Sequence, residues 1–270
     1  MFIDFGGVDV AFRVIESGLR PRFSEAETAT LVGTLWPDAF DGSAVRLEGV
    51  QVGDGQVRLM LSETSFYQLL VSNLLVGHPV ESLLKVGAVT LREKALAVAT
   101  EKVAAEDVLG RPWMANALAV SVLIRDSRGD FLLVRRGDAL AVGAGLWGVS
   151  ASGGVEAEDL RSGNPIANAV IREVKEELGL SIDPGAVRVD GLFIGDKKLQ
   201  PVILCTVALD EPLGPLLPLQ GVDSDLEVAS QVLVSQDDLK KYMERKRMSE
   251  AARFQISIHT PNNVARIIAI

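Results

Sequence analysis

The chain has 270 residues, of which 48% are hydrophobic and 23% are charged, and its 36 acidic and 27 basic residues give a formal net charge of −9. This composition is typical of a globular protein that forms one large domain or two ordinary ones. The negative charge argues against nucleic-acid binding, because proteins that bind phosphate backbones usually carry a basic face. A small polyanionic substrate is compatible with it if a cation neutralises nearby carboxylates.

Cysteine usage and hydropathy indicate the compartment. Cys205 is the only cysteine, so the chain can form no internal disulfide, which favours a reducing compartment. Charged residues such as Asp4 and Asp9 interrupt the first twenty positions and argue against a signal peptide. Apolar stretches such as 116–125 are too short to span a bilayer. We therefore expect a soluble, cytoplasmic protein that makes no membrane contact.

The first half of the chain predicts a mixture of helices and strands. Residues 24–36 open with the capping box Ser24-x-x-Glu27, which predicts a helix. Apolar and polar residues alternate in 43–52 and 55–62 on both sides of a glycine-containing turn, which predicts a β-hairpin. After this hairpin, helical spacing following a serine predicts a second helix over residues 62–76.

A boundary between two parts is predicted where Gly110 and Pro112 interrupt the periodic pattern. We expect a smaller N-terminal α+β accessory domain over residues 1–112 and a second domain over residues 113–270. The first part has no evident nucleophile, metal cluster or phosphate-binding loop of its own. We therefore expect it to shape a pocket or an oligomer interface, and a homodimer is one arrangement compatible with this.

In the second half, residues 116–126 and 130–137 flank a short turn and predict another hairpin. The glycine-rich stretch 145–154 is expected to be a loop. The elements expected after it are a helix from 165, strands at about 186–195, 200–209 and 231–235, a helix over 236–247 and a final helix after Pro261. Because helices and strands alternate irregularly, a mixed α/β (α+β) sandwich fits better than a doubly wound sheet.

The helix that begins at residue 165 has clear signals at both ends. Asn164 is a favourable N-cap, Pro165 a favourable first residue, and Gly179 can supply the left-handed stop. Its apolar side is a stripe formed by Ala167, Val170, Val174 and Leu178. The helix is therefore expected to pack on a core along this stripe.

Three glutamates lie beside the stripe. Glu173, Glu176 and Glu177 have i, i+3 and i+4 spacing, so their side chains are expected to converge. Like charges at i,i+4 cost a helix roughly 0.2–0.5 kcal/mol per pair, and Arg172 relieves only part of this. Clustered carboxylates suit Mg²⁺ or Mn²⁺, which would remove the repulsion. A solvated charged face, with Arg172 and Lys175 as ordinary partners, is the alternative.

Residues 153–180 resemble the Nudix box, written G-x5-E-x7-R-E-U-x-E-E-x-G-U, where U is apolar. The helical half of the motif matches at Arg172, Glu173, Val174, Glu176, Glu177, Gly179 and Leu180. Residues 129–137 and 145–154 are similar to the strand and tryptophan-containing loop that precede the box. The resemblance covers roughly residues 115–270 and implies a Nudix-type α/β/α sandwich with a mixed sheet.

The front half of the box departs from the pattern. Gly154 lies four positions too far from Arg172, which indicates an insertion within residues 158–163. Asn164 stands where the motif has its first glutamate, so Arg172 loses one expected partner. The family commonly adds a backbone carbonyl beside the loop glycine to the metal ligands, which here implies Gly153 or Gly154.

The resemblance implies an enzyme that hydrolyses an acid anhydride, the diphosphate bond of a nucleoside diphosphate linked to another moiety. It implies a catalytic role for Arg172 and metal binding by Glu173, Glu176 and Glu177. A metal held there neutralises phosphate oxygens and lowers the pKa of a water molecule. The candidates for the general base lie in an acidic loop and are Asp223, Asp225 and Glu227. A solvated loop is the alternative reading of these three residues.

Side chains near the predicted hairpin and loop are candidates for substrate binding. They are Arg135, Arg136 and Trp147, with Lys197 and Lys198 as weaker candidates. Residues 61–73 are faintly similar to a segment of UDP-glucose/galactose-type Nudix pyrophosphatases, which favours a nucleotide-sugar substrate.

Two other functions share this fold. A catalytically weak Nudix-fold sensor of nucleotide ligands usually loses box glutamates, whereas this chain keeps all three. Isopentenyl-diphosphate-type isomerases use a cysteine, but Cys205 lies in an apolar stretch, 202–209, where a buried structural thiol is expected.

Overall fold

The computed structural model describes residues 1–53, 55–138, 143–161 and 163–260. Its main sheet has the strand order β1-β9-β10-β5-β6-β11, with β7 paired to β6 and β8 paired to β5. These strands are β1 (Phe2–Asp4), β5 (Ala119–Arg125), β6 (Phe131–Arg136), β7 (Trp147–Gly148), β8 (Ala151–Gly154), β9 (Val187–Ile194), β10 (Pro201–Ala208) and β11 (Val228–Val234). Strand β10 runs parallel to β5 and the other pairs are antiparallel, so the sheet is mixed, as predicted.

A second sheet has the order β2-β4-β3, with residues Asp9–Val14, Gln56–Ser65 and Ser43–Gly53 respectively. The helices are α1 (Glu25–Leu35), α2 (Phe66–Val71), α3 (Val80–Leu83), α4 (Val89–Ala99), α5 (Pro165–Leu178), α6 (Ser224–Glu227), α7 (Leu239–Arg245) and α8 (Glu250–Ile258). None of these helices, which are those of the described residues, is long and apolar enough to cross a membrane.

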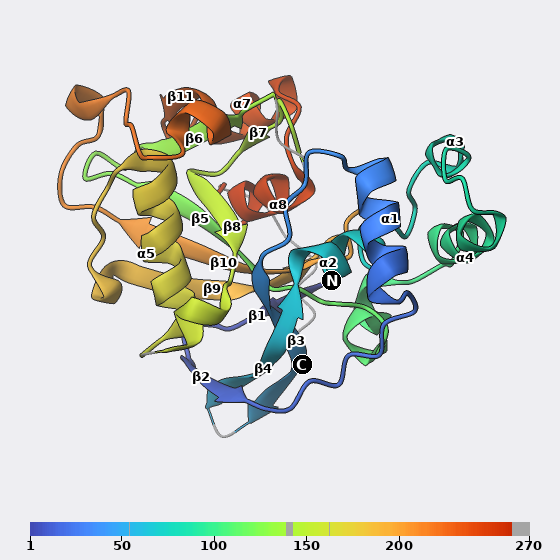
Figure 1. Ribbon diagram of the computed structural model, residues 1–270. Helices are drawn as coiled ribbons and strands as arrows, with labels where there is room; N and C mark the ends of the chain where they lie inside the picture. Colours follow the sequence, from blue (N-terminus) through green and yellow to red (C-terminus); the bar gives the residue numbers. More distant parts are fainter. Residues whose placement is uncertain (54, 139–142, 162, 261–270) are drawn as a thin grey trace.

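Helices cover both faces of the main sheet. Figure 1 shows α5 in yellow on one side of strands β5 and β10, and α8 in red on the other. Strand β5 serves both layers, because successive side chains of a strand point to opposite faces. Val120 and Val122 lie in the same buried cluster as Val174 of α5, whereas Leu123 packs in the cluster that contains Ile256 of α8. The predicted α/β/α sandwich is confirmed.

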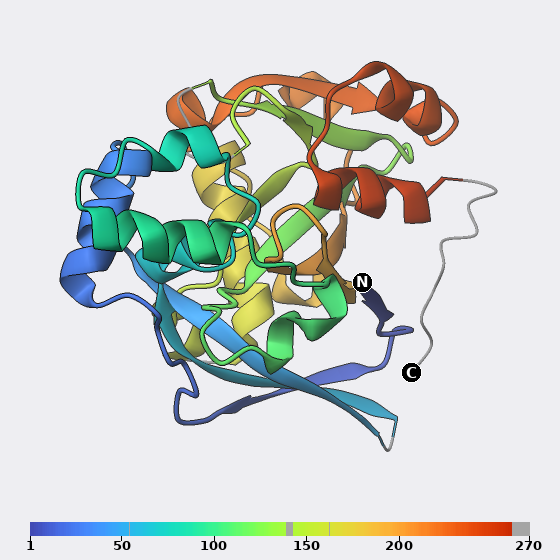
Figure 2. The ribbon, with the colours of Figure 1, turned by 90° about the vertical axis from the view of Figure 1, so that its right-hand side faces the viewer.

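The N-terminal half shares its core with the second half. Strand β1 joins the edge of the main sheet, where Phe2 pairs with Phe193 of β9. Leu47 and Leu59, from the second sheet, are fully buried in the cluster that contains Val174. In Figure 2 this second sheet lies below the rest of the molecule, and α1 and α4 lie beside it. The predicted domain boundary between residues 112 and 113 stays a prediction. Side chains from both sides of it pack in one core.

Several predicted elements are confirmed, and one begins later than predicted. Helix α1 has the Ser24–Glu27 capping box, and the hairpins β3–β4 and β5–β6 form. The helix predicted over 62–76 is wrong at both ends, because β4 continues to Ser65 along β3 and α2 stops at Val71, after which residues 72–76 form turns. The Ser65 side chain then accepts a hydrogen bond from the backbone N–H of Gln68 (3.4 Å) and caps α2.

Two further differences concern short or unexpected elements. The stretch 145–154, predicted as a loop, contains β7 and β8, which are too short to reveal an alternating pattern. Helix α8 was not predicted, although Ser249 caps it by accepting from the backbone N–H of Ala252 (3.3 Å). The helix predicted after Pro261 lies outside the described residues.

A buried polar junction ties the two halves together. The Asn73 amide nitrogen donates to the Asn116 side-chain oxygen (3.1 Å) and to the Leu199 carbonyl (2.7 Å). In return, the Asn116 backbone N–H donates to the Asn73 side-chain oxygen (3.0 Å). Both asparagines have no exposed surface. Each of these hydrogen bonds therefore takes the place of a hydrogen bond that the same group makes to water in the unfolded chain. The junction fixes α2 against the loop that precedes β5.

We expect Asn73→Ala to lower the free energy of unfolding by about 1–3 kcal/mol, because it leaves buried partners without hydrogen bonds. Urea denaturation followed by circular dichroism measures this change. Gln51→Ala, which removes an exposed amide from β3, is the control and should stay within about 0.5 kcal/mol of the wild type. Equal stability of the two variants would contradict a structural role for the junction.

Candidate active site

Helix α5 has the ends that its sequence predicts. The Asn164 side chain accepts hydrogen bonds from the backbone N–H groups of Ile166 (3.0 Å) and Ala167 (3.1 Å). At the other end Gly179 adopts φ of 70° and donates to the Lys175 carbonyl (2.9 Å). These caps fix where the helix starts and stops, and so they fix which residues face the sheet.

Two box glutamates are buried where α5 meets β8. Glu173 is 7% exposed and Glu177 is 3% exposed. The Ser152 backbone N–H donates to Glu177 Oε1 (3.0 Å). A methyl group built on Gly153 would overlap the Glu173 carboxylate, so only glycine permits this close approach. The strand and the helix are therefore matched around the two carboxylates.

Burial disfavours the charged form of these two carboxylates and raises their pKa values. Desolvation raises the pKa of Glu173 to about 7, although the charge of Arg172 opposes the shift. Desolvation also raises the pKa of Glu177 to about 8, against the hydrogen bond from Ser152. The side chain of Glu176 is 36% exposed and lies closer to solvent. The protein thus holds two carboxylates in a position where their negative charge is costly.

Arg172 connects the glutamates. Its Nη1 donates to Glu173 Oε1 (2.7 Å) and to Glu176 Oε2 (3.2 Å), and its Nη2 donates to the Gly154 carbonyl (2.7 Å). Burial alone would lower the pKa of Arg172, but its carboxylate partners outweigh burial and raise it. The guanidinium is therefore a permanent positive charge that orients the acidic groups and the end of β8.

The partner that the sequence analysis found missing for Arg172 is Asp159. Its carboxylate accepts from Arg172 Nη2 (3.0 Å) and Nε (3.4 Å), and it also accepts from the Glu156 backbone N–H (2.9 Å). Asp159 is only 5% exposed and lies in a 3-10 turn over Ala157–Arg161. This turn falls within the insertion, so the added residues supply an acid in place of the one at position 164.

The donor set fits a hard divalent cation in its chemistry. Three carboxylates from one helix, of which two are desolvated, are the oxygen ligands that such ions prefer. The backbone of Gly153 lies against the Glu173 carboxylate, and a ligand role for the carbonyl of Gly153 or Gly154 stays a prediction. Within the described ranges, no group of three or more acidic, histidine or cysteine side chains forms a ready-made metal site.

Arg136 approaches Glu177 through Ser152. Its Nη1 donates to the Ser152 hydroxyl (2.9 Å), while the backbone of the same serine bonds to Glu177. Its Nη2 lies 3.9 Å from Glu227 Oε2. Burial, together with the charges of Asp223 and Glu176, raises the pKa of Glu227, and the charge of Arg136 opposes this. Of the three candidate bases, Glu227 is the one that lies beside Arg136.

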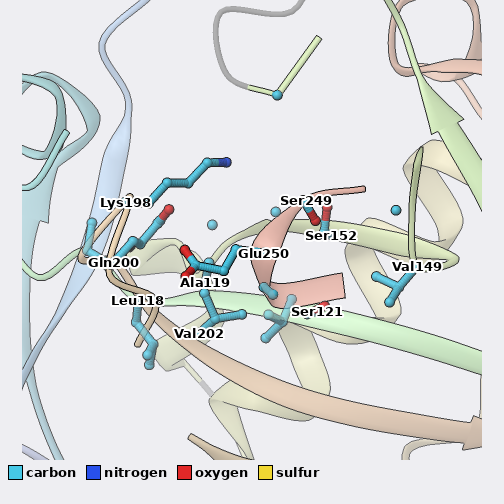
Figure 3. Close-up of a pocket in the computed structure, with 18 of the residues that line it drawn as sticks. Leu118, Ala119, Ser121, Val149, Ser152, Lys198, Gln200, Val202, Ser249 and Glu250 are labelled. Carbon is cyan, nitrogen blue, oxygen red and sulfur yellow. Dashed lines mark hydrogen bonds between the residues drawn. The ribbon is translucent and has the colours of Figure 1, made fainter. Parts of the chain in front are cut away.

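Of the charged box residues, Glu177 faces a cavity of about 320 Å³, whereas Arg172 and Glu176 border a separate surface pocket. The wall of the cavity includes Arg136, Ser152, Gly153 and Glu177, and also Lys198 from the loop between β9 and β10. Figure 3 shows the Lys198 side chain extending across the pocket from the loop that also carries Gln200, with Ser152 and Ser249 on the other side. A methyl group on Gly143 would lie 3.7 Å from Arg136 Nε and 3.8 Å from Lys198 Nζ, so two cations border one region.

Other predicted residues lie elsewhere. Arg135 pairs with Asp138 (2.6 Å), and Trp147 packs edge-on against Tyr242 with ring centroids 5.3 Å apart. Neither Arg135 nor Trp147 is among the residues that line the cavity. Asp225 and Lys197 are exposed and Asp223 is half-buried. Binding or catalytic roles for these residues stay predictions.

We expect Asp159→Asn to reduce turnover about 10- to 100-fold, as is typical when a residue that orients a metal-binding group is lost. The variant should also need more Mg²⁺ for half-maximal activity, because Arg172 no longer holds Glu173 and Glu176 in place. Steady-state kinetics over a Mg²⁺ titration measures both effects. Glu158→Gln is the matched control, since Glu158 forms only an exposed pair with Arg161. An Asp159→Asn variant that behaves like the control would show that Arg172 needs no such partner.

This chain is similar to several solved structures over about half of its length. The MutT protein from Methanosarcina mazei Go1 is 24% identical, over 53% of this chain and 91% of that one, with a TM-score of 0.38. DR0079 from Deinococcus radiodurans is 16% identical, over 52% of this chain and 82% of that one, with a TM-score of 0.40. The search of curated proteins found no match.

A third solved structure is a bifunctional NMN adenylyltransferase/ADP ribose pyrophosphatase from Francisella tularensis. It is 20% identical, over 61% of this chain and 47% of that one, with a TM-score of 0.40. At such scores the structural likenesses carry no conclusion about substrate. The family model described as the NUDIX domain, in contrast, matches residues 115–253, which is just over half of the chain and includes α5 with its glutamates. The chain therefore belongs to the Nudix family and is a Nudix-type pyrophosphohydrolase.

Proposed function

We propose that this enzyme hydrolyses the diphosphate bond of a nucleoside diphosphate linked to another moiety, with Mg²⁺ or Mn²⁺ as its cofactor. The observation that carries the proposal is the composition of the cavity wall. Glu177 and the Gly153 backbone border the same cavity as Arg136 and Lys198. One of the candidate metal-binding carboxylates thus lies in the same space as two basic side chains that suit phosphate.

The metal would be held by Glu173, Glu176, Glu177 and the Gly153 carbonyl. When bound, it supplies neutralisation of phosphate oxygens and a lower pKa for water. Arg136 and Lys198 bind and orient the diphosphate. Lys198 lines this cavity together with Glu250, whose negative charge acts on it. Burial lowers the pKa of Lys198, and the neighbouring charge of Arg136 lowers it further, so a bound diphosphate would favour its charged form.

Glu227 is the proposed general base. Its raised pKa makes its carboxylate a stronger proton acceptor than an ordinary glutamate. The 3.9 Å approach to Arg136 Nη2 would keep this carboxylate near the phosphate that Arg136 binds. Glu227 would take a proton from the attacking water as the bond to phosphorus forms and the bond to the bridging oxygen breaks.

A nucleotide sugar remains the substrate favoured by the resemblance of residues 61–73. An isomerase mechanism is disfavoured, because Cys205 has no exposed surface and burial raises the pKa of its thiol well above the usual value. A sensor without activity is disfavoured by the three intact glutamates.

We expect Glu176→Gln and Glu177→Gln each to reduce turnover by about 10²-fold or more, as expected for the loss of a catalytic metal contact. A panel of nucleoside diphosphate compounds with Mg²⁺ identifies the substrate by the phosphorylated products released. Glu93→Gln, an equivalent change on an exposed position of α4, is the control and should keep wild-type activity. Near-normal turnover in both box variants would exclude this site, and no cleavage of any diphosphate would exclude the reaction.

Glu227→Gln should lower kcat by about 10²-fold, within the range for removal of a general base, and should change KM little. Asp225→Asn provides a matched control from the same acidic segment, since Asp225 is exposed. The pH dependence of kcat separates the roles. The part of the low-pH loss that reports Glu227 should disappear in Glu227→Gln and persist in Asp225→Asn, while the part caused by protonation of Glu173 and Glu177 remains in both. If both variants keep the wild-type profile, another group is the base.

A further inference from the structure

The cavity beside Glu177 extends to the N-terminal half. Besides the residues of the Nudix part, its wall includes Ala44 of β3, Phe66 and Leu69 of α2, and Leu74. The buried junction of Asn73 holds this segment in place. One continuous space therefore connects Glu177 to side chains that precede the Nudix domain.

The N-terminal side of this space is apolar. Ala44 and Leu69 are buried together with Ala117, and Phe66 and Leu74 pack on this cluster. Phe66 and Leu74 nevertheless keep part of their surface exposed, and they line the cavity. We refer to Ala44, Phe66, Leu69 and Leu74 as the apolar wall. Partly exposed apolar side chains in a concave site gain stability when a ligand covers them.

Polar groups lie between the apolar wall and the glutamates. The loop that carries Lys198 is fixed by Glu250, whose carboxylate accepts from the backbone N–H groups of Asp196 and Lys197, at 3.2 Å each. In the same loop region the Gln200 amide nitrogen donates to the Ala117 carbonyl (3.2 Å). This bond orients the Gln200 amide, and its oxygen remains as an acceptor at the edge of the apolar wall.

We propose that the apolar wall binds the heterocyclic base of the nucleotide, while Arg136 and Lys198 hold the diphosphate next to Glu177. This inference rests on the proposed function. It adds which part of the substrate the enzyme selects, namely the base. A sugar in this position would bury several hydroxyl groups against Phe66, Leu69 and Leu74, which offer no hydrogen bonds. A base instead has apolar faces for the wall and a polar edge that Gln200 can meet.

The test uses a nucleoside diphosphate sugar and the same compound with hydrogen in place of the base. Phe66→Ala should raise KM for the base-bearing compound at least about fivefold, the lower end of the range for losing a base–aromatic contact. The base-free compound should keep its kcat/KM within about twofold. Phe40→Ala is the matched control, because Phe40 is 87% exposed and does not line the cavity. Leu74→Ser tests the same wall with a second, partly exposed residue.

A binding measurement separates this inference from the hydrolytic function. Calorimetry with a nucleoside monophosphate and with ribose 5-phosphate, in the presence of EDTA, needs no turnover. Phe66→Ala should weaken binding of the nucleotide and leave that of the sugar phosphate unchanged. If the wild type cleaves neither diphosphate, the hydrolytic function fails, while calorimetry still decides the role of the wall. Equal effects of Phe66→Ala and Phe40→Ala, equal effects on both ligands, or a preference for an alkyl diphosphate over the base-bearing compound would overturn the proposal.

Discussion

The burial of two carboxylates between α5 and β8 is the constraint on which the site depends. Glu173 and Glu177 are stable in this position only because neighbouring groups have matching shapes and charges. Gly153 leaves space for one carboxylate, Ser152 donates a backbone hydrogen bond to the other, and Arg172 supplies a positive charge. Each of these partners also has a second contact that fixes it. The desolvation that raises the two pKa values is therefore built into the packing of the sandwich.

The N-terminal half contributes to this arrangement through packing and not through chemistry of its own. Its second sheet completes the core beneath α5, and its helix α2 forms one side of the cavity. The fully buried junction between Asn73 and Asn116 makes the position of that side specific, because polar groups without water must find their partners. A rigid wall of this kind costs a ligand little ordering on binding.

The features that could be predicted from sequence are those encoded locally. The helix from Asn164 to Gly179 follows from a cap, a stop and an apolar stripe, all within a few residues of one another. Asp159 could not be assigned to Arg172 in the same way, since their contact depends on how an inserted turn folds back on α5. The available signal in the sequence was an acidic residue within the insertion, together with an arginine whose usual partner in the motif is missing.

Long-range contacts account for most of the remaining differences. The last residues of β4, up to Ser65, were predicted as the start of a helix. They form strand because pairing with β3 overrides the local preference. The cavity combines side chains from residue 44 to residue 251, and no spacing along the chain reveals such a set. Arg136 and Arg135 are adjacent in sequence, and only the fold distinguishes the one that faces the cavity from the one that pairs with Asp138.

The pairing of Phe2 with Phe193 also has a consequence for the order of folding. Strand β1 is synthesised before its hydrogen-bonding partner β9, which follows almost two hundred residues later. At ribosomal speeds of roughly 5–20 residues per second, β1 waits on the order of 10–40 s for it. Contacts of such wide sequence separation slow folding, and until β1 docks the outer edge of β9 is open to pairing with other chains. The edge of the sheet at β9 is thus covered by a segment almost two hundred residues away in sequence.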